Sequence, residues 1–137
     1  MTVGGRLSLV ANKGKQKGTR WETAVLTFFR KHGLDYEKVH QLENKDEGDG
    51  VVRTPRNGVR VVVEAKAEQR IDLPNYLRQV KGEAVEYAGS RSLSADVESG
   101  VRTVYGAAVV KARNKAVGEA YVVMRLEDFV DLVGRWL

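Results

Sequence analysis

Cysteine is absent from this 137-residue sequence, and histidine occurs only twice. Without cysteine the chain can form no disulfide bond, no thiolate metal site and no cysteine nucleophile. Two histidines alone are also too few for a structural zinc site. No apolar run approaches the ~20 residues that a membrane span needs, and the N-terminus has no signal-peptide core. We therefore expect a soluble, cytoplasmic protein with no membrane partner.

Acidic residues are missing from the first 21 positions, whereas basic residues are not. The basic residues there are Arg6, Lys13, Lys15, Lys17 and Arg20. The chain has 23 basic and 18 acidic residues, a net charge of +5, so without these five the remainder is balanced at 18 of each. We predict a flexible basic arm at residues 1–18 and a single domain at residues 19–137, which the length of the chain also favours.

The arm combines lysine with glycine, a composition typical of a tail that contacts nucleic-acid phosphates. Its candidate DNA contacts are Lys13, Lys15, Lys17 and Arg20. The alternative is a solvated terminus that binds nothing in particular.

Hydrophobic periodicity and turn residues predict three helices and five strands. The helices are predicted at residues 19–32, 72 to 87 or 89, and 127–137, and the strands at 36–42, 49–54, 59–66, 101–111 and 119–124. We expect the last helix to face inward with Leu126, Phe129, Val130, Val133 and Leu137. This order predicts an α/β fold, with a central mixed five-stranded sheet flanked by helices.

The strand predicted at residues 59–66 carries charge on one face only. Alternation places Val59, Val61, Val63 and Ala65 on one side, and Arg60, Val62, Glu64, Lys66 and Glu68 on the other. By itself this pattern is typical of a half-buried strand with a solvated face.

The hairpin turn decides whether Asp49 joins that charged face. A turn at residues 57–58 pairs Asp49 with Lys66, and a turn at residues 56–57 pairs Asp49 with Glu64. In both registers the three side chains share one face at the open end of the hairpin. A three-residue loop would move Asp49 to the other face.

Opposed carboxylates on such a face have Cβ atoms about 5 Å apart and repel each other unless a cation lies between them. A hard divalent ion with oxygen ligands meets this need, and magnesium is the usual one where the substrate is a phosphate. Lys66 could then orient or deprotonate an attacking water and neutralise developing charge. Metal-assisted hydrolysis of a phosphodiester requires such a set of groups.

Glu22 has two interpretations. The segment Thr19-Arg20-Trp21-Glu22 has the form of a capping box, in which the glutamate bonds back to the first residue of the helix. Glu22 also lies beside the apolar face of the helix, so it could border the sheet and its charged residues.

The sequence resembles the PD-(D/E)xK nuclease superfamily, and within it the small archaeal-type Holliday junction resolvases, including phage or prophage versions. The matching segments are residues 17–22 (KGTRWE), 48–52 (GDGVV) and 61–66 (VVVEAK), followed by Gln79 in the next predicted helix. The resemblance covers nearly the whole chain in order, and it implies a restriction-endonuclease-like fold.

The resemblance also implies roles for individual residues. Asp49, Glu64 and the backbone carbonyl of Ala65 would hold magnesium, with manganese as a substitute. Lys66 would serve the attacking water, and Glu22 would add an acidic ligand, directly or through water. For the helix that follows, the resemblance implies that Gln79 supports the site or the scissile phosphate; the alternative is an ordinary exposed helix residue.

One motif position departs from the family pattern. Gly48 stands where a proline usually precedes the first motif aspartate. Asp46 and Glu47, just before it, offer another assignment of that aspartate.

The resemblance implies a magnesium-dependent endonuclease that resolves four-way DNA junctions by paired nicks. Two symmetric nicks need two sites, so we expect a homodimer. The alternatives are a flap, single-strand, exonucleolytic or nicking enzyme with the same fold, and a non-catalytic DNA-binding scaffold.

Overall fold

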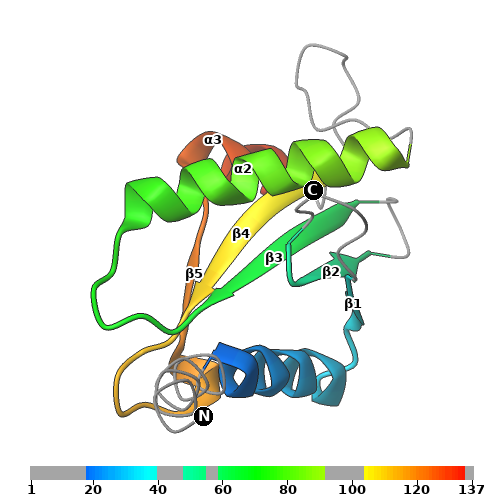
Figure 1. Ribbon diagram of the computed structural model, residues 1–137. Coiled ribbons are helices and arrows are strands. Elements are labelled where there is room, and N and C mark those ends of the chain that lie inside the picture. The colour runs from blue at the N-terminus through cyan, green and yellow to red at the C-terminus, as the bar shows by residue number, and fades with distance from the viewer. Residues whose placement is uncertain (1–17, 40–47, 55–58, 92–103, 135–137) are drawn as a thin grey trace, which may run out of the picture.

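The computed structural model describes residues 18–39, 48–54, 59–91 and 104–134. They form a five-stranded sheet with helices on both of its faces (Figure 1). The predicted α/β class and the predicted order of elements are confirmed.

The sheet is mixed, with strand order β1-β2-β3-β4-β5. Its strands are β1 (Asp35–Lys38), β2 (Gly50–Arg53), β3 (Arg60–Lys66), β4 (Val104–Val110) and β5 (Tyr121–Val123). Only the β3–β4 pair is parallel, and the other three pairs are antiparallel. The parallel pair needs a crossover, which α2 (Leu73–Ser90) provides. The predicted hairpin of β2 and β3 is present, but its turn lies outside the described residues.

Helix α2 begins where the sequence predicts. Asp72 is its N-cap and accepts a hydrogen bond from the backbone N–H of Asn75, and Pro74 occupies the first turn. The helix lies close to β4 because Gly106 has no side chain. A Cβ atom built there would lie 2.6 Å from Val80 Cγ1 and 2.8 Å from the Val80 carbonyl oxygen. This close approach holds the first half of α2 over the end of β3.

The opposite face of the sheet is covered by a helix that includes residues 18–31 (Figure 1). Trp21 is 5% exposed and packs with Val25, Val63 and Val109. Its indole N–H donates to the Val109 carbonyl at 3.1 Å, a buried bond that contributes about 1 kcal/mol. Trp21 therefore ties this helix to β4 and fixes the position of its neighbour Glu22.

The capping box predicted at Thr19 is not formed. Residue 18 is already helical, so Thr19 lies inside the helix and cannot be its N-cap. The helix starts earlier than the sequence pattern indicates, and Glu22 therefore has no capping role toward Thr19.

The last helix, α3 (Leu126–Gly134), contradicts the predicted burial. The residues predicted to face inward are exposed instead: Leu126 76%, Phe129 51%, Val130 60% and Val133 37%. Asp128 is buried, and Asp131 accepts a hydrogen bond from the Tyr105 hydroxyl of β4. The acidic side of α3 thus meets the sheet, because the buried Tyr105 hydroxyl needs an acceptor. Leu137 lies outside the described residues.

Within the described ranges, no helix combines the length and the apolar character needed to cross a bilayer.

Candidate active site

The candidate site lies at the C-terminal end of β3. Gly50 pairs with Val63 and Val51 with Val62, so the register continued by one residue places Asp49 opposite Glu64. The backbone N–H of Asp49 donates to the Val63 carbonyl at 3.0 Å. Of the alternatives that the sequence left open, this is the register in which the two carboxylates oppose each other, with Asp49 on the charged face.

Gly48 shapes the backbone that leads into Asp49. Its φ is +90°, a value that favours glycine and that proline cannot adopt. A Cβ atom at Gly48 would also lie 2.7 Å from Val62 Cγ1 and 2.9 Å from Glu83 Oε2. Glycine is therefore required here, and a proline at this position would not fit.

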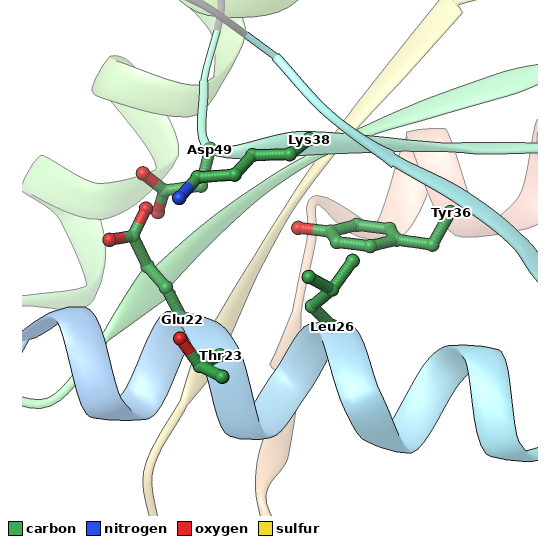
Figure 2. Close-up of a pocket in the computed structure, with 6 residues that line it drawn as sticks. All are labelled: Glu22, Thr23, Leu26, Tyr36, Lys38 and Asp49. Atoms are coloured by element: carbon green, nitrogen blue, oxygen red, sulfur yellow. The ribbon is translucent and has the colours of Figure 1, made fainter.

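Asp49 is held from two sides. Its Oδ2 accepts a hydrogen bond from the backbone N–H of Ala65 at 2.8 Å. Its carboxyl group also shares a hydrogen bond with the carboxyl group of Glu22, which reaches it from the N-terminal helix (Figure 2). The structure thus brings Glu22 to the predicted site, in agreement with the second of its two interpretations.

The pKa of the Asp49 carboxyl is raised from its ordinary value of 3.8 to about 7. Burial is the largest cause, followed by the hydrogen bond with Glu22, while the Ala65 N–H and the charge of Lys66 act in the opposite direction. Near neutral pH a substantial fraction of the Asp49 carboxyl groups therefore keep their proton. A divalent cation bound between Glu22 and Asp49 would reduce the repulsion between their two negative charges.

Two further side chains border this carboxyl pair. Lys38 of β1 and the buried Tyr36 line the small pocket between Glu22 and Asp49, and Figure 2 shows the Lys38 amino group directed toward both carboxyl groups. Burial raises the pKa of the Tyr36 phenol, so it stays protonated. Sequence reasoning missed Lys38, because only the pairing of β1 with β2 brings it beside Asp49.

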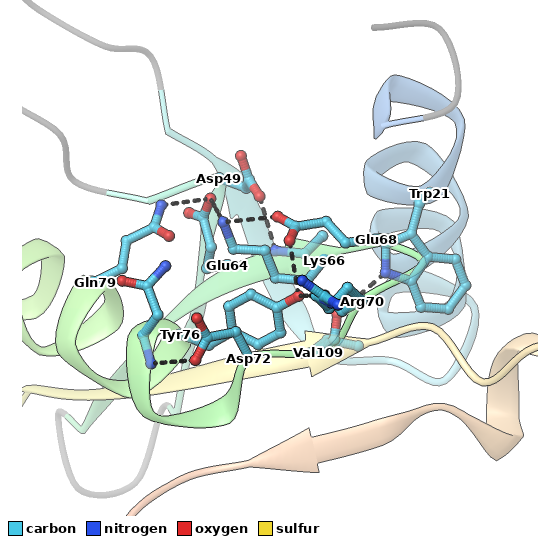
Figure 3. Close-up of polar contacts among 12 residues, drawn as sticks. Trp21, Asp49, Glu64, Lys66, Glu68, Arg70, Asp72, Tyr76, Gln79 and Val109 are labelled. Carbon is cyan, nitrogen blue, oxygen red and sulfur yellow. Dashed lines mark hydrogen bonds and ion pairs between the residues drawn. The ribbon is translucent and has the colours of Figure 1, made fainter. Parts of the chain in front are cut away.

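Glu64 is held by α2 and by its own strand (Figure 3). Gln79 donates from Nε2 to Glu64 Oε1 at 3.1 Å. Lys66 Nζ lies 3.7 Å from the same oxygen. Gln79 is only partly exposed, so the structure places it against a predicted site residue rather than in open solvent.

Lys66 is enclosed, with 14% of its side chain exposed. Its Nζ lies 3.9 Å from Glu68 Oε1 and 5.4 Å from the ring centre of Tyr76. The Tyr76 hydroxyl in turn donates to Glu68 Oε2 at 3.0 Å (Figure 3). The sequence pattern shows Tyr76 only as part of an apolar stripe, and its contact with the lysine's environment depends on the placement of α2.

The donor set of the site matches the ligand preference of a magnesium ion. Carboxylate and carbonyl oxygens are the ligands that magnesium prefers, and Glu22, Asp49 and Glu64 supply them. In the part of the chain that the structure describes, no three acidic or histidine side chains gather as a ready-made metal group. The carboxylate oxygens are suitable ligands for magnesium. Glu22 and Asp49 form a hydrogen-bonded pair, and Glu64 lies opposite Asp49 on the neighbouring strand.

Most of the candidate DNA contacts fall outside the described residues, namely Lys13, Lys15 and Lys17. Arg20 is exposed on the helix, two residues before Glu22.

Comparison with protein-family models gives no match, and comparison with curated proteins gives none either.

Proposed function

We propose that this chain is a magnesium-dependent DNA endonuclease of the PD-(D/E)xK type, which resolves four-way junctions by paired nicks. The observation that carries the proposal is the grouping at the end of β3. Asp49 lies opposite Glu64, Lys66 Nζ lies 3.7 Å from Glu64, and Glu22 shares a hydrogen bond with Asp49. Three elements supply these groups, namely the N-terminal helix, the residue before β2, and β3, and their mutual geometry is what favours a catalytic site.

In this proposal Asp49, Glu64, the Ala65 carbonyl and Glu22 hold the metal ion, with manganese as a substitute for magnesium. When bound, the ion supplies positive charge for the phosphate oxygens and lowers the pKa of a water molecule.

The protein's own groups position these ligands and balance the charge. The Ala65 N–H and the Gln79 amide each fix one carboxylate through a single hydrogen bond. Lys66, held between Glu64 and Glu68, orients the attacking water and offsets the negative charge that grows on the phosphate.

The partners we propose are branched DNA and a second copy of the chain, in the cytoplasm of a prokaryotic or phage-infected cell. A twofold dimer would present two sites to the two strands that are cut. The apolar residues on α3 and the edge strand β5 support this part of the proposal. Phe129 and Val130 on α3, and Val122 on β5, are each more than half exposed, and β5 pairs only with β4 among the described strands.

Cleavage of matched, end-labelled DNAs in magnesium tests the proposal. The panel contains a four-way junction, a flap, a duplex and a single strand, and Lys66→Met is assayed beside the wild type. Lys81→Met is the matched control, because Lys81 is an exposed lysine of α2. We expect symmetric nicks on the junction alone, a loss of about 100-fold or more in Lys66→Met, and no change in Lys81→Met.

The other outcomes separate the alternatives. Cleavage of flap or single-stranded DNA would keep the site and change the substrate. Binding without cleavage, in manganese as well, would favour a non-catalytic scaffold. Equal activity in Lys66→Met and the wild type would contradict the proposed mechanism.

A further inference from the structure

Beside the candidate site lies a hollow of about 340 Å³ that none of the proposed catalytic residues lines. Its lining residues are Ala67, Glu68, Gln69, Ile71, Lys111, Arg113, Asn114 and Tyr121. They come from the segments that follow β3 and β4 and from the start of β5. Its size falls at the lower end of the range of about 300–1,000 Å³ that is usual for ligand sites.

The hollow is adjacent to the site because β3 and β4 are parallel. Lys66 pairs with Val110, and the backbone N–H of Lys111 donates to the Lys66 carbonyl at 2.8 Å. The two chain segments therefore leave the sheet at the same edge, and from there one turns toward α2 and the other toward the N-terminal helix (Figure 1). The edge formed by the carboxyl ends of parallel strands is where α/β sheets commonly bind ligands.

The charge of the hollow favours an anion. Among the described residues, neither Lys111 nor Arg113 forms an ion pair, and both are exposed. Lys111 Nζ lies 5.9 Å from the ring centre of Trp21, the residue before Glu22. Glu68 is the one acidic residue that lines the hollow, and Tyr76 and Lys66 already engage it.

The hollow also offers an aromatic surface. Tyr121, at the start of β5, is 54% exposed, and Ile71 on the opposite segment is 47% exposed. An accessible aromatic ring beside cations without a carboxylate partner is the combination with which proteins bind single-stranded nucleic acid, because the ring stacks on a base while the cations hold phosphates.

We propose that this hollow binds one unpaired nucleotide next to the scissile phosphodiester, with its base on Tyr121 and its phosphate on Arg113 and Lys111. The inference rests on the proposed function, since it assigns the path of the cut strand beyond Lys66. It gives a physical reason for selecting branched DNA over continuous duplex, because base pairs open most easily where stacking is interrupted at the branch point, and an opened pair frees a base for Tyr121.

Binding of a fluorescein-labelled thymidine pentanucleotide to the full-length protein tests this assignment, measured by anisotropy in EDTA so that no cleavage occurs. We expect Tyr121→Ala to weaken binding at least about fivefold, the lower bound for removing one ring that stacks on a base. Tyr121→Phe retains a ring and is expected to bind like the wild type, which also guards against a folding defect. Val85→Ala is the control, because Val85 of α2 is as exposed as Tyr121, at 54%, and does not line the hollow.

The role of Arg113 in holding a phosphate is tested by the salt dependence of the same binding. Arg113→Gln should lower the slope of log K against log salt by about 0.7, the value for one neutralised phosphate on a single strand. Lys115→Gln, a change of an exposed lysine in the same loop that does not line the hollow, should leave the slope unchanged.

The outcomes distinguish this inference from the proposed function. Equal binding by Tyr121→Ala and Val85→Ala, or no binding of the pentanucleotide at all, would overturn the nucleotide site even if the protein cleaves DNA. Tyr121-dependent binding by a protein that cleaves no DNA would uphold the nucleotide site and overturn the nuclease proposal.

Discussion

Gln79 of α2 donates a hydrogen bond from its Nε2 to Oε1 of Glu64 on β3, at 3.1 Å. This single bond joins the helix that crosses over the sheet to the strand that carries the candidate metal ligand. It restrains Oε1 of Glu64, the oxygen that also lies 3.7 Å from Lys66 Nζ.

Gln79→Ala should therefore weaken magnesium-dependent cleavage without abolishing it. Removal of a partner that orients a metal ligand costs 10- to 100-fold in metal affinity or activity, so about that fall in apparent magnesium affinity is expected. Titration of cleavage rate against magnesium measures it. Arg78→Ala changes the exposed neighbouring residue and serves as the control. An equal effect of both variants would show that Gln79 acts only through the helix.

Asp49 should make the metal-free protein less stable as pH rises from about 4 to 7. The folded state keeps a proton on Asp49 up to a pKa of about 7, whereas the unfolded chain loses it near 3.8. Between these values the folded state binds more protons, so raising the pH favours unfolding. Urea unfolding in EDTA across this range measures the effect.

Asp49→Asn should remove that part of the pH dependence. Asp35→Asn, at an exposed aspartate of β1, should leave it in place. A pH profile that is the same in Asp49→Asn and the wild type would contradict the raised pKa of Asp49.

The exposed face of α3 should be where two copies meet. Val130→Asp places a charge on a side chain that is 60% exposed in the single chain and that a dimer would bury, so dimer dissociation should increase at least about tenfold. Sedimentation analysis at several concentrations measures this. Val85→Asp is the matched control, since Val85 is an exposed valine of α2. A wild type that is monomeric at every concentration would remove the dimer from the proposal.

Deletion of residues 1–17 should weaken binding to duplex DNA and flatten its salt dependence. The removed segment carries four of the basic residues and no acidic one. The log–log slope should fall by about 0.9 for each phosphate that the shortened protein no longer neutralises. Binding measured at four or more salt concentrations gives the slope, and an unchanged slope would identify the segment as a tail that binds no phosphate.

The valine-rich strands and the start of α2 were predictable, because strand alternation and helix caps act over a few residues. The hairpin rule left two registers with Asp49 on the charged face and one loop length that would place it on the other face, and the structure has the register that opposes Asp49 to Glu64. Local sequence patterns could not decide between the two interpretations of Gln79, since its contact with Glu64 depends on how α2 lies on the sheet.

The failures have physical causes as well. The stripe of Leu126, Phe129 and Val130 has correct helical spacing, but spacing cannot tell whether the sheet, solvent or another chain covers it. The polar side of α3 contacts the sheet because the Tyr105 hydroxyl needs Asp131 as its acceptor. Glu22 was ambiguous because the sequence pattern placed the helix start too late.

Gly106 links the packing of the core to the geometry of the candidate site. Val80, which lies against Gly106, directly follows Gln79 in the chain. A methyl group at residue 106 would collide with the backbone of Val80 and push α2 away from the sheet. The amide of Gln79 would then move away from Glu64. A substitution in the middle of the sheet would therefore change how Glu64 is held and, in the enzyme that we propose, how tightly the metal ion binds.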